Sequence, residues 1–153
     1  MTTNKTMLEW GGILLALVFA ALAGLHLYWA AGGRWGIKVS IPTIPDAVKG
    51  SRQAFNPSPF ATVLVAVALL VAMLTILGQI GWWGTALPPG IFRWATRGIA
   101  ALFFLRAIGE FRLIGFFKRV RDTPFALWDT WLFSPLCLVI AGIAFLLTYY
   151  ARN

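Results

Sequence analysis

The sequence predicts an all-α integral membrane protein, a bundle of four transmembrane helices. The composition is 59% hydrophobic and only 12% charged, far from that of a soluble domain. The chain also holds four apolar runs of about 20 residues, each long enough to cross a hydrocarbon core of about 30 Å as a helix. At 153 residues, we expect one domain over residues 1–153. The runs are Trp10 to Ala31, Phe60 to Ile80, Gly98 to Phe117 and Trp131 to Tyr150.

The first run resembles a cleavable signal peptide, because Lys5 precedes it and Ala21-Leu22-Ala23 could be a cleavage site. However, Glu9 lies in the region that should be basic, and the apolar run continues through Trp29. We therefore predict that this run is the first transmembrane helix.

The longest connection follows, from Gly32 to Asn56, and at about 25 residues it is too long for a passive link. Apolar side chains recur along it, so we predict that it folds over the bundle as a lid, with a disordered loop as the alternative. The second run starts at Ser58-Pro59, a cap followed by proline at the first helical position. Pro88-Pro89-Gly90 then predicts a tight turn.

The third run contains two charged residues, Arg106 and Glu110. Charged side chains at membrane depth are costly, so they face a partner or a water-filled cavity. Residues four apart share a helical face, so we expect an Arg106–Glu110 ion pair. Thr123-Pro124 and Ser134-Pro135 are two further helix starts. They predict a short interfacial helix from Pro124 to Phe133, a break, and then the last span.

Basic residues predict the orientation. Eight Lys and Arg residues flank one side of the four spans and four flank the other. The positive-inside rule then makes the richer side cytoplasmic and places both termini in the periplasm. Three of the eight lie just after the third run and are candidates for lipid headgroup binding: Arg112, Lys118 and Arg119.

The same side collects the unusual polar and aromatic residues, so we predict one site there. Glu110 and His26 are the candidates for proton transfer. The candidates for ligand binding are Arg106, Tyr28, Trp29, Asp129 and Ser134.

Three functions fit this site. The first is binding or converting a lipid-like amphiphile by proton transfer, with Arg106 holding Glu110 ionised. The second is transport of a small solute or proton, which would require a homo-oligomer. The third is structural, an Arg–Glu pair that only determines helix packing. The sequence does not decide between these functions, nor whether the protein is an enzyme.

Several partners are excluded or not expected. The net charge of +8 comes from residues that flank apolar runs, a pattern of membrane topology and lipid contact rather than nucleic-acid binding. One histidine and one cysteine, Cys137, cannot form a metal cluster by themselves, and we predict no metal. Phosphate loops and dinucleotide fingerprints are missing from the sequence, so we predict no cofactor. Membrane lipids are the expected partners, with an amphiphilic small molecule as a further candidate.

The chain resembles a family of small bacterial four-helix membrane proteins that is catalogued only as a domain of unknown function. The resemblance covers nearly the whole sequence and implies a bacterial inner-membrane protein, but it implies no reaction and no ligand. It rests on the following patterns: His26-x-Tyr28-Trp29-Ala30-x-Gly32-Gly33-x-Trp35-Gly36, Arg106-Ala-Ile-Gly-Glu110-Phe-Arg112, Gly115-Phe-Phe-Lys118-Arg119, Asp129-Thr130 and Ser134-Pro135-Leu136.

Overall fold

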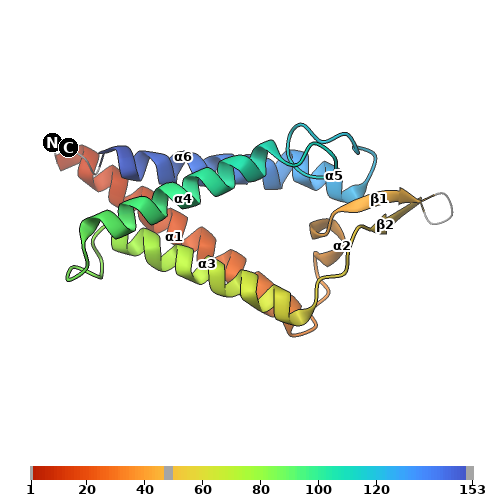
Figure 1. Ribbon diagram of the computed structural model, residues 1–153, viewed down its shortest axis with the longest axis horizontal. Coiled ribbons are helices and arrows are strands. Elements are labelled where there is room, and N and C mark those ends of the chain that lie inside the picture. The colour runs from red at the N-terminus through yellow and green to blue at the C-terminus, as the bar shows by residue number, and fades with distance from the viewer. Residues whose placement is uncertain (1, 47–49, 151–153) are drawn as a thin grey trace.

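The computed structural model describes residues 2–46 and 50–150, and helices dominate it (Figure 1). The long helices are α1 (Thr2–Ala30), α3 (Pro59–Gln79), α4 (Pro89–Ile108) and α6 (Ser134–Tyr150). Shorter elements lie at one end of the molecule: helices α2 (Ile37–Ser40) and α5 (Pro124–Trp128), and the antiparallel strands β1 (Thr43–Asp46) and β2 (Gly50–Gln53).

Within residues 2–46 and 50–150, three helical stretches are long and apolar enough to cross a membrane: Thr6–Ala30, Pro59–Gln79 and Pro124–Tyr150. They correspond to the first, second and fourth predicted runs, so the prediction of a helical membrane protein is confirmed. The third run differs. Its helix is displaced toward the N-terminus and carries three arginines, and it is not among those stretches.

The prediction of a helix over Gly98–Phe117 was wrong at its end, because α4 stops at Ile108. Gly109 has φ +87° and ψ −174°, a conformation that is essentially restricted to glycine. Gly115 also has positive φ, and the two glycine backbones lie in contact. A Cβ on Gly109 would meet the backbone at Ile114, and a Cβ on Gly115 would meet the backbone at Ile108. Glu110 therefore lies beyond the helix, in a loop.

The predicted break before the last span was also wrong. α5 continues through a π-helical turn, Asp129–Phe133, directly into α6. Pro135 lacks an amide hydrogen and its ring would crowd the preceding turn of a regular α-helix. A π-turn at this point is one way to accommodate a proline without interrupting the helix.

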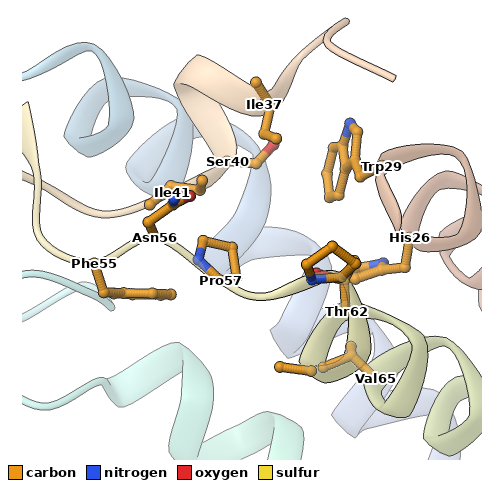
Figure 2. Close-up of a pocket in the computed structure, with 12 residues that line it drawn as sticks. His26, Trp29, Ile37, Ser40, Ile41, Phe55, Asn56, Pro57, Thr62 and Val65 are labelled. Atoms are coloured by element: carbon orange, nitrogen blue, oxygen red, sulfur yellow. The ribbon is translucent and has the colours of Figure 1, made fainter. Parts of the chain in front are cut away.

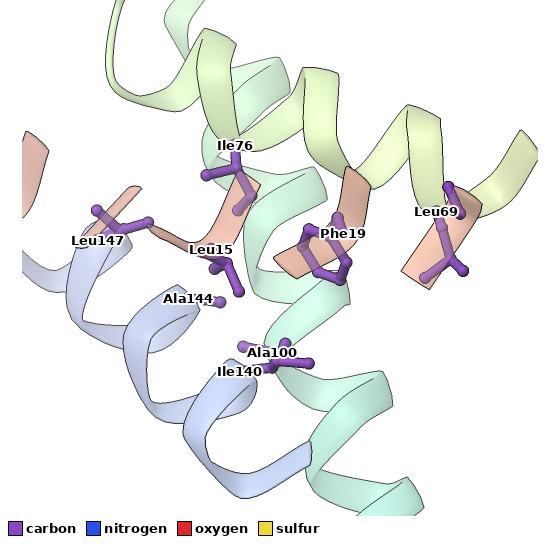
Figure 3. Packing of buried hydrophobic residues seen from close by; sticks show 9 residues of the cluster. Leu15, Phe19, Leu69, Ile76, Ala100, Ile140, Ala144 and Leu147 are labelled. Carbon is purple, nitrogen blue, oxygen red and sulfur yellow. The ribbon is translucent and has the colours of Figure 1, made fainter. Parts of the chain in front are cut away.

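The four long helices share one apolar core (Figure 3). α1 packs along α3, and α4 packs along α6. The two pairs approach each other at the end where α1 begins and α6 ends, and they diverge toward the other end (Figure 1). The side chains that join them are Leu15, Phe19 and Ala23 of α1, Leu69 and Ile76 of α3, Ala100 of α4, and Ile140, Ala144 and Leu147 of α6.

The long first connection is folded, and it contains α2 and the hairpin. Ile41 and Thr43 are buried, and this segment packs against α5. It also lines a cavity together with the end of α1 and the start of α3. The connection thus links the diverging ends of the two helix pairs (Figure 1). Residues 47–49, which include one of the counted lysines, lie outside the described residues.

Candidate functional site

Asp129 is fully buried at the start of the π-helical turn and is the centre of an ion cluster. Its Oδ1 accepts a hydrogen bond from Arg106 Nη2 at 2.8 Å. Its Oδ2 accepts from the Gly115 amide at 2.8 Å and from Lys118 Nζ at 3.0 Å. The three donors come from α4 and from the loop after it, so this carboxylate connects that loop to the last helix.

Lys118 is only 2% exposed, and its ammonium group is fully engaged within the protein. Besides Asp129, Nζ donates to the Gly115 carbonyl at 3.1 Å and to Thr130 Oγ1 at 2.6 Å. The Thr130 hydroxyl in turn donates to the Ala126 carbonyl at 2.9 Å. A buried cation requires an internal partner and Lys118 has several, so its burial counts against the headgroup role, which stays a prediction.

The prediction of an Arg106–Glu110 pair was wrong, because α4 ends at Ile108, between the two residues. Arg106 pairs with Asp129, and the Glu110 side chain is exposed in the loop, where its Oε1 accepts from the Leu113 amide at 2.5 Å. The rule of four-residue spacing applies only while the helix continues, and Gly109 ends it. A glycine at this position of a helical run is a sequence signal for a helix end, which would separate Arg106 from Glu110.

The cluster holds one carboxylate against two cations, an excess of one positive charge. Within the described part of the chain, Arg106 Nη1 and Ser134 Oγ are both buried without a hydrogen-bond partner. Both oxygens of Asp129 already accept from protein donors, and the residue is 0% exposed. The predicted ligand-binding roles of Asp129 and Ser134 remain predictions.

Arg112 and Arg119, the two other headgroup candidates, have exposed side chains. Their loop closes on itself, because the Arg112 carbonyl accepts from the Arg119 amide at 3.2 Å and from the Val120 amide at 3.0 Å. Exposure leaves both guanidinium groups able to reach a headgroup, which remains a prediction.

His26 lies in a different region, on the rim of a cavity of about 330 Å³ at the end of α1. This volume is at the lower end of the range for small-molecule sites, about 300–1,000 Å³. Figure 2 shows that the lining side chains come from α1, from α2, from the segment before α3 and from α3 itself. They are His26, Trp29, Ile37, Ser40, Ile41, Phe55, Asn56, Pro57, Pro59, Ala61, Thr62 and Val65.

Three polar groups of this cavity, on His26, Ser40 and Thr62, already use a hydrogen within the protein, whereas the Asn56 amide can both donate and accept. His26 Nδ1 lies 2.8 Å from the Leu22 carbonyl oxygen, which can only accept, so Nδ1 carries the hydrogen. In the neutral ring, Nε2 is then an acceptor. Ser40 Oγ donates to the Gly36 carbonyl at 2.9 Å, and Thr62 Oγ1 donates to the Ser58 carbonyl at 3.0 Å. The two hydroxyls and the imidazole therefore offer lone pairs rather than hydrogens.

The predicted convergence on one site does not occur at this cavity. Among the described residues that line it, none is Arg106, Glu110, Asp129 or Ser134. The polar residues instead form two separate groups, the ion cluster beside α5 and the cavity at the end of α1. The expected proton exchange between Glu110 and His26 has no geometric support here.

Tyr28 and Trp29 differ in position although they are adjacent in sequence. Trp29 lines the cavity, and its Nε1 donates to the Trp35 carbonyl at 2.8 Å. The Tyr28 hydroxyl accepts from the Trp35 amide at 3.4 Å. Both side chains thus hold the turn after α1, and Trp29 alone of the pair also contacts the cavity. Tyr28 remains a ligand-binding prediction without a place in the cavity wall.

Sequence reasoning missed most of the cavity wall. Ile37, Ile41 and Phe55 belong to the apolar side chains that recur along the long connection, and no sequence pattern marks Ser40, Asn56 or Thr62 as cavity residues. The sequence signal for this wall is the long connection, because its recurring apolar side chains are expected to pack on another apolar surface. The position of that surface depends on how the connection returns to α3, which the sequence pattern does not specify.

These features define a class, a small helical membrane protein with a buried ion cluster and a mostly apolar cavity. The chain belongs to the family described as "Protein of unknown function (DUF3995)", whose model matches residues 17–145. The resemblance inferred from the sequence is thereby confirmed. The matched range extends from within α1 to within α6 and includes the ion cluster and the cavity. No curated protein and no solved structure matches the sequence.

Proposed function

We propose that this protein binds a lipid-like amphiphile in the cavity beside His26. The observation that carries the proposal is the composition of the wall: mostly apolar side chains with a few polar groups at defined positions. This combination is typical of small-molecule sites, where apolar walls supply affinity and polar groups set orientation. The cavity lies at the end of a helix that is long and apolar enough to span a membrane, so a lipid tail has access to it.

The hydrogen bonds of the wall favour one kind of polar head. His26, Ser40 and Thr62 present acceptors, and the Asn56 amide can donate or accept, so the wall favours a head that donates a hydrogen bond. A long-chain or polycyclic alcohol can bond to all of these groups, whereas an ester or ether oxygen can accept only from the Asn56 amide. A cavity of about 330 Å³ holds the head and the first part of a chain, and the remainder of the tail would extend into the bilayer.

The proposal is for binding rather than conversion. Proton transfer was expected between His26 and Glu110, and Glu110 lies in the loop beyond α4. The structural alternative is favoured for the ion cluster, because both oxygens of the buried Asp129 already accept from Arg106, Lys118 and a backbone amide. We propose that the cluster holds the loop after α4 in place and is separate from the ligand site.

A photoactivatable twelve-carbon alcohol tests the proposal, with its methyl ether as the matched probe that lacks the donor. Labelled peptides from the purified protein are identified by mass spectrometry. We expect the alcohol to label residues 26–41 and 55–65 and the ether to label them more weakly. His26→Phe should lower alcohol labelling about fivefold, the value of one hydrogen bond of about 1 kcal/mol, and should leave the ether unchanged.

Two alanines on α3 provide a steric control. Ala61 lines the cavity, and Ala68 is exposed two turns further along without lining it. Ala61→Phe should abolish labelling and Ala68→Phe should not. Equal labelling of the Ala61→Phe variant and the unsubstituted protein would show that the alcohol does not bind in this cavity.

A further inference from the structure

A second apolar surface lies on the outside of the molecule, between α4 and α6. It is a groove of about 580 Å³, and it shares no residue with the His26 cavity. Three small residues line it, the buried Ala100 on α4 and Ala141 on α6 and the exposed Gly142 on α6. Phe104 and Phe145 form its walls and are 51% and 59% exposed. Alanine and glycine have too little side chain to fill the space between α4 and α6 here, which leaves the groove open.

One cation lies at the end of this groove. Arg97 lines it, and the guanidinium stacks over the Trp94 ring at 4.7 Å from the ring centroid. Among the ion pairs of the described residues, none includes Arg97. Seven residues separate it from Phe104 on α4, so the apolar part of the groove extends about 10 Å from the charge.

The position of the groove indicates what covers it. Its α6 side belongs to the stretch Pro124–Tyr150, which is long and apolar enough to cross a membrane, so lipid is the medium around it. Phe145 lies near the end of that stretch and packs against Tyr149, an aromatic residue of the kind that marks a headgroup level. A cation at that level above an apolar groove is complementary to an anionic phospholipid, whose negative headgroup lies above apolar acyl chains.

We propose that the groove between α4 and α6 binds an acyl chain of an anionic membrane phospholipid, whose phosphate pairs with Arg97. The phosphate supplies the counter-charge that the described residues do not. The acyl chain covers Ala100, Ala141 and Gly142, and Phe104 and Phe145 flank it. This site is independent of the amphiphile proposed for the His26 cavity.

Native mass spectrometry of the full chain in detergent tests the charge. The probes are dioleoyl phosphatidylglycerol and dioleoyl phosphatidylcholine, which share acyl chains and differ in net charge. We expect the protein to bind phosphatidylglycerol more tightly. Arg97→Gln should weaken phosphatidylglycerol binding roughly tenfold, the scale of one charge-assisted hydrogen bond. It should weaken phosphatidylcholine binding less, because the choline cation already compensates the charge of that phosphate. Arg93→Gln removes the same charge one turn earlier, outside the groove, and should preserve the preference.

Gly142→Leu tests the shape. An added Cβ at Gly142 meets no atom within 4 Å, so a side chain can begin there without a clash, and we expect a leucine to occupy part of the groove. Gly24 on α1 has equally open surroundings and does not line the groove, so Gly24→Leu is the matched control. We expect Gly142→Leu to reduce binding of both lipids and Gly24→Leu to leave both unchanged.

Three results would overturn the proposal. The first is an unchanged phosphatidylglycerol preference in Arg97→Gln, and the second is unchanged lipid binding in Gly142→Leu. The third is a dimer that Gly142→Leu dissociates and Gly24→Leu does not, because a second copy of the chain would then occupy the groove. Loss of alcohol labelling at the His26 cavity has no bearing on any of these readouts.

Discussion

The carboxylate of Asp129 illustrates how a single buried charge can organise distant residues. It is 0% exposed and accepts three hydrogen bonds, two of them from the cations Arg106 and Lys118. Burying an ion without a partner costs several kcal/mol, so each cation is needed where it lies. The loop after α4 carries one of the cations and therefore cannot leave without exposing or unpairing a charge.

Asp129→Asn should destabilise the protein by about 3–5 kcal/mol, because it leaves Lys118 buried without a counter-charge. Unfolding by dodecyl sulfate, followed by circular dichroism, measures the loss. Glu110→Gln is the control, since this carboxylate is exposed and should change stability by no more than about 0.5 kcal/mol. A larger loss of unfolding free energy for Glu110→Gln than for Asp129→Asn would contradict the Arg106–Asp129 pairing and support an Arg106–Glu110 pair.

At the scale of elements, the boundary of α4 depends on backbone conformation rather than on hydrophobicity. The apolar run continues past Ile108, but Gly109 adopts positive φ and its backbone contacts that of Gly115. The Phe116 amide then donates to the Ala107 carbonyl at 2.9 Å, which closes the loop onto the helix end. This closure places the Gly115 amide against Asp129.

Gly109→Ala should destabilise the protein, because the new Cβ meets the Ile114 carbonyl and the φ of +87° is strained for alanine. We expect a loss of more than about 1 kcal/mol in the same unfolding assay. Gly98→Ala, in the interior of α4 with no atom within 4 Å of the added Cβ, should instead stabilise by roughly 0.5–1 kcal/mol. If both substitutions behaved alike, Gly109 would not determine the end of the helix.

At the scale of the whole molecule, the start of α1 and the end of α6 lie together (Figure 1). The predicted four crossings would place these two ends on one side, and they would need α4 to cross the membrane despite its three arginines. Lys118 is buried, so the excess of basic residues falls from eight against four to seven against four, and its direction is unchanged. In this orientation the His26 cavity is near the cytoplasmic side and Arg97 is near the periplasmic side.

Reporter fusions test this orientation in a bacterial inner membrane. Alkaline phosphatase fused to the C-terminus should be active, because that enzyme requires the periplasm, and green fluorescent protein fused there should be dark. The physical reason is the excess of Lys and Arg on the opposite side. A fluorescent C-terminal fusion would show that the orientation is inverted.

The sequence by itself determined the class of protein, the approximate position of three spans and the helix starts at Ser58 and Thr123. Both caps are present, since the two hydroxyls accept from Ala61 and Ala126 amides. These features are local or compositional: an apolar run must avoid water wherever the rest of the chain lies, and a cap bonds a residue three positions away. The membership of an uncharacterised family follows from the same local patterns.

The tertiary structure alone decided which charges meet. Asp129 is 23 residues from Arg106 in the sequence, and hydrophobic periodicity says nothing about a pairing across that separation. The choice of Asp129 over Glu110 depends on a positive φ at Gly109, and the cavity depends on the path of the first connection back to α3. Both are contacts between segments distant in sequence, whose free energies arise only after the helices have packed.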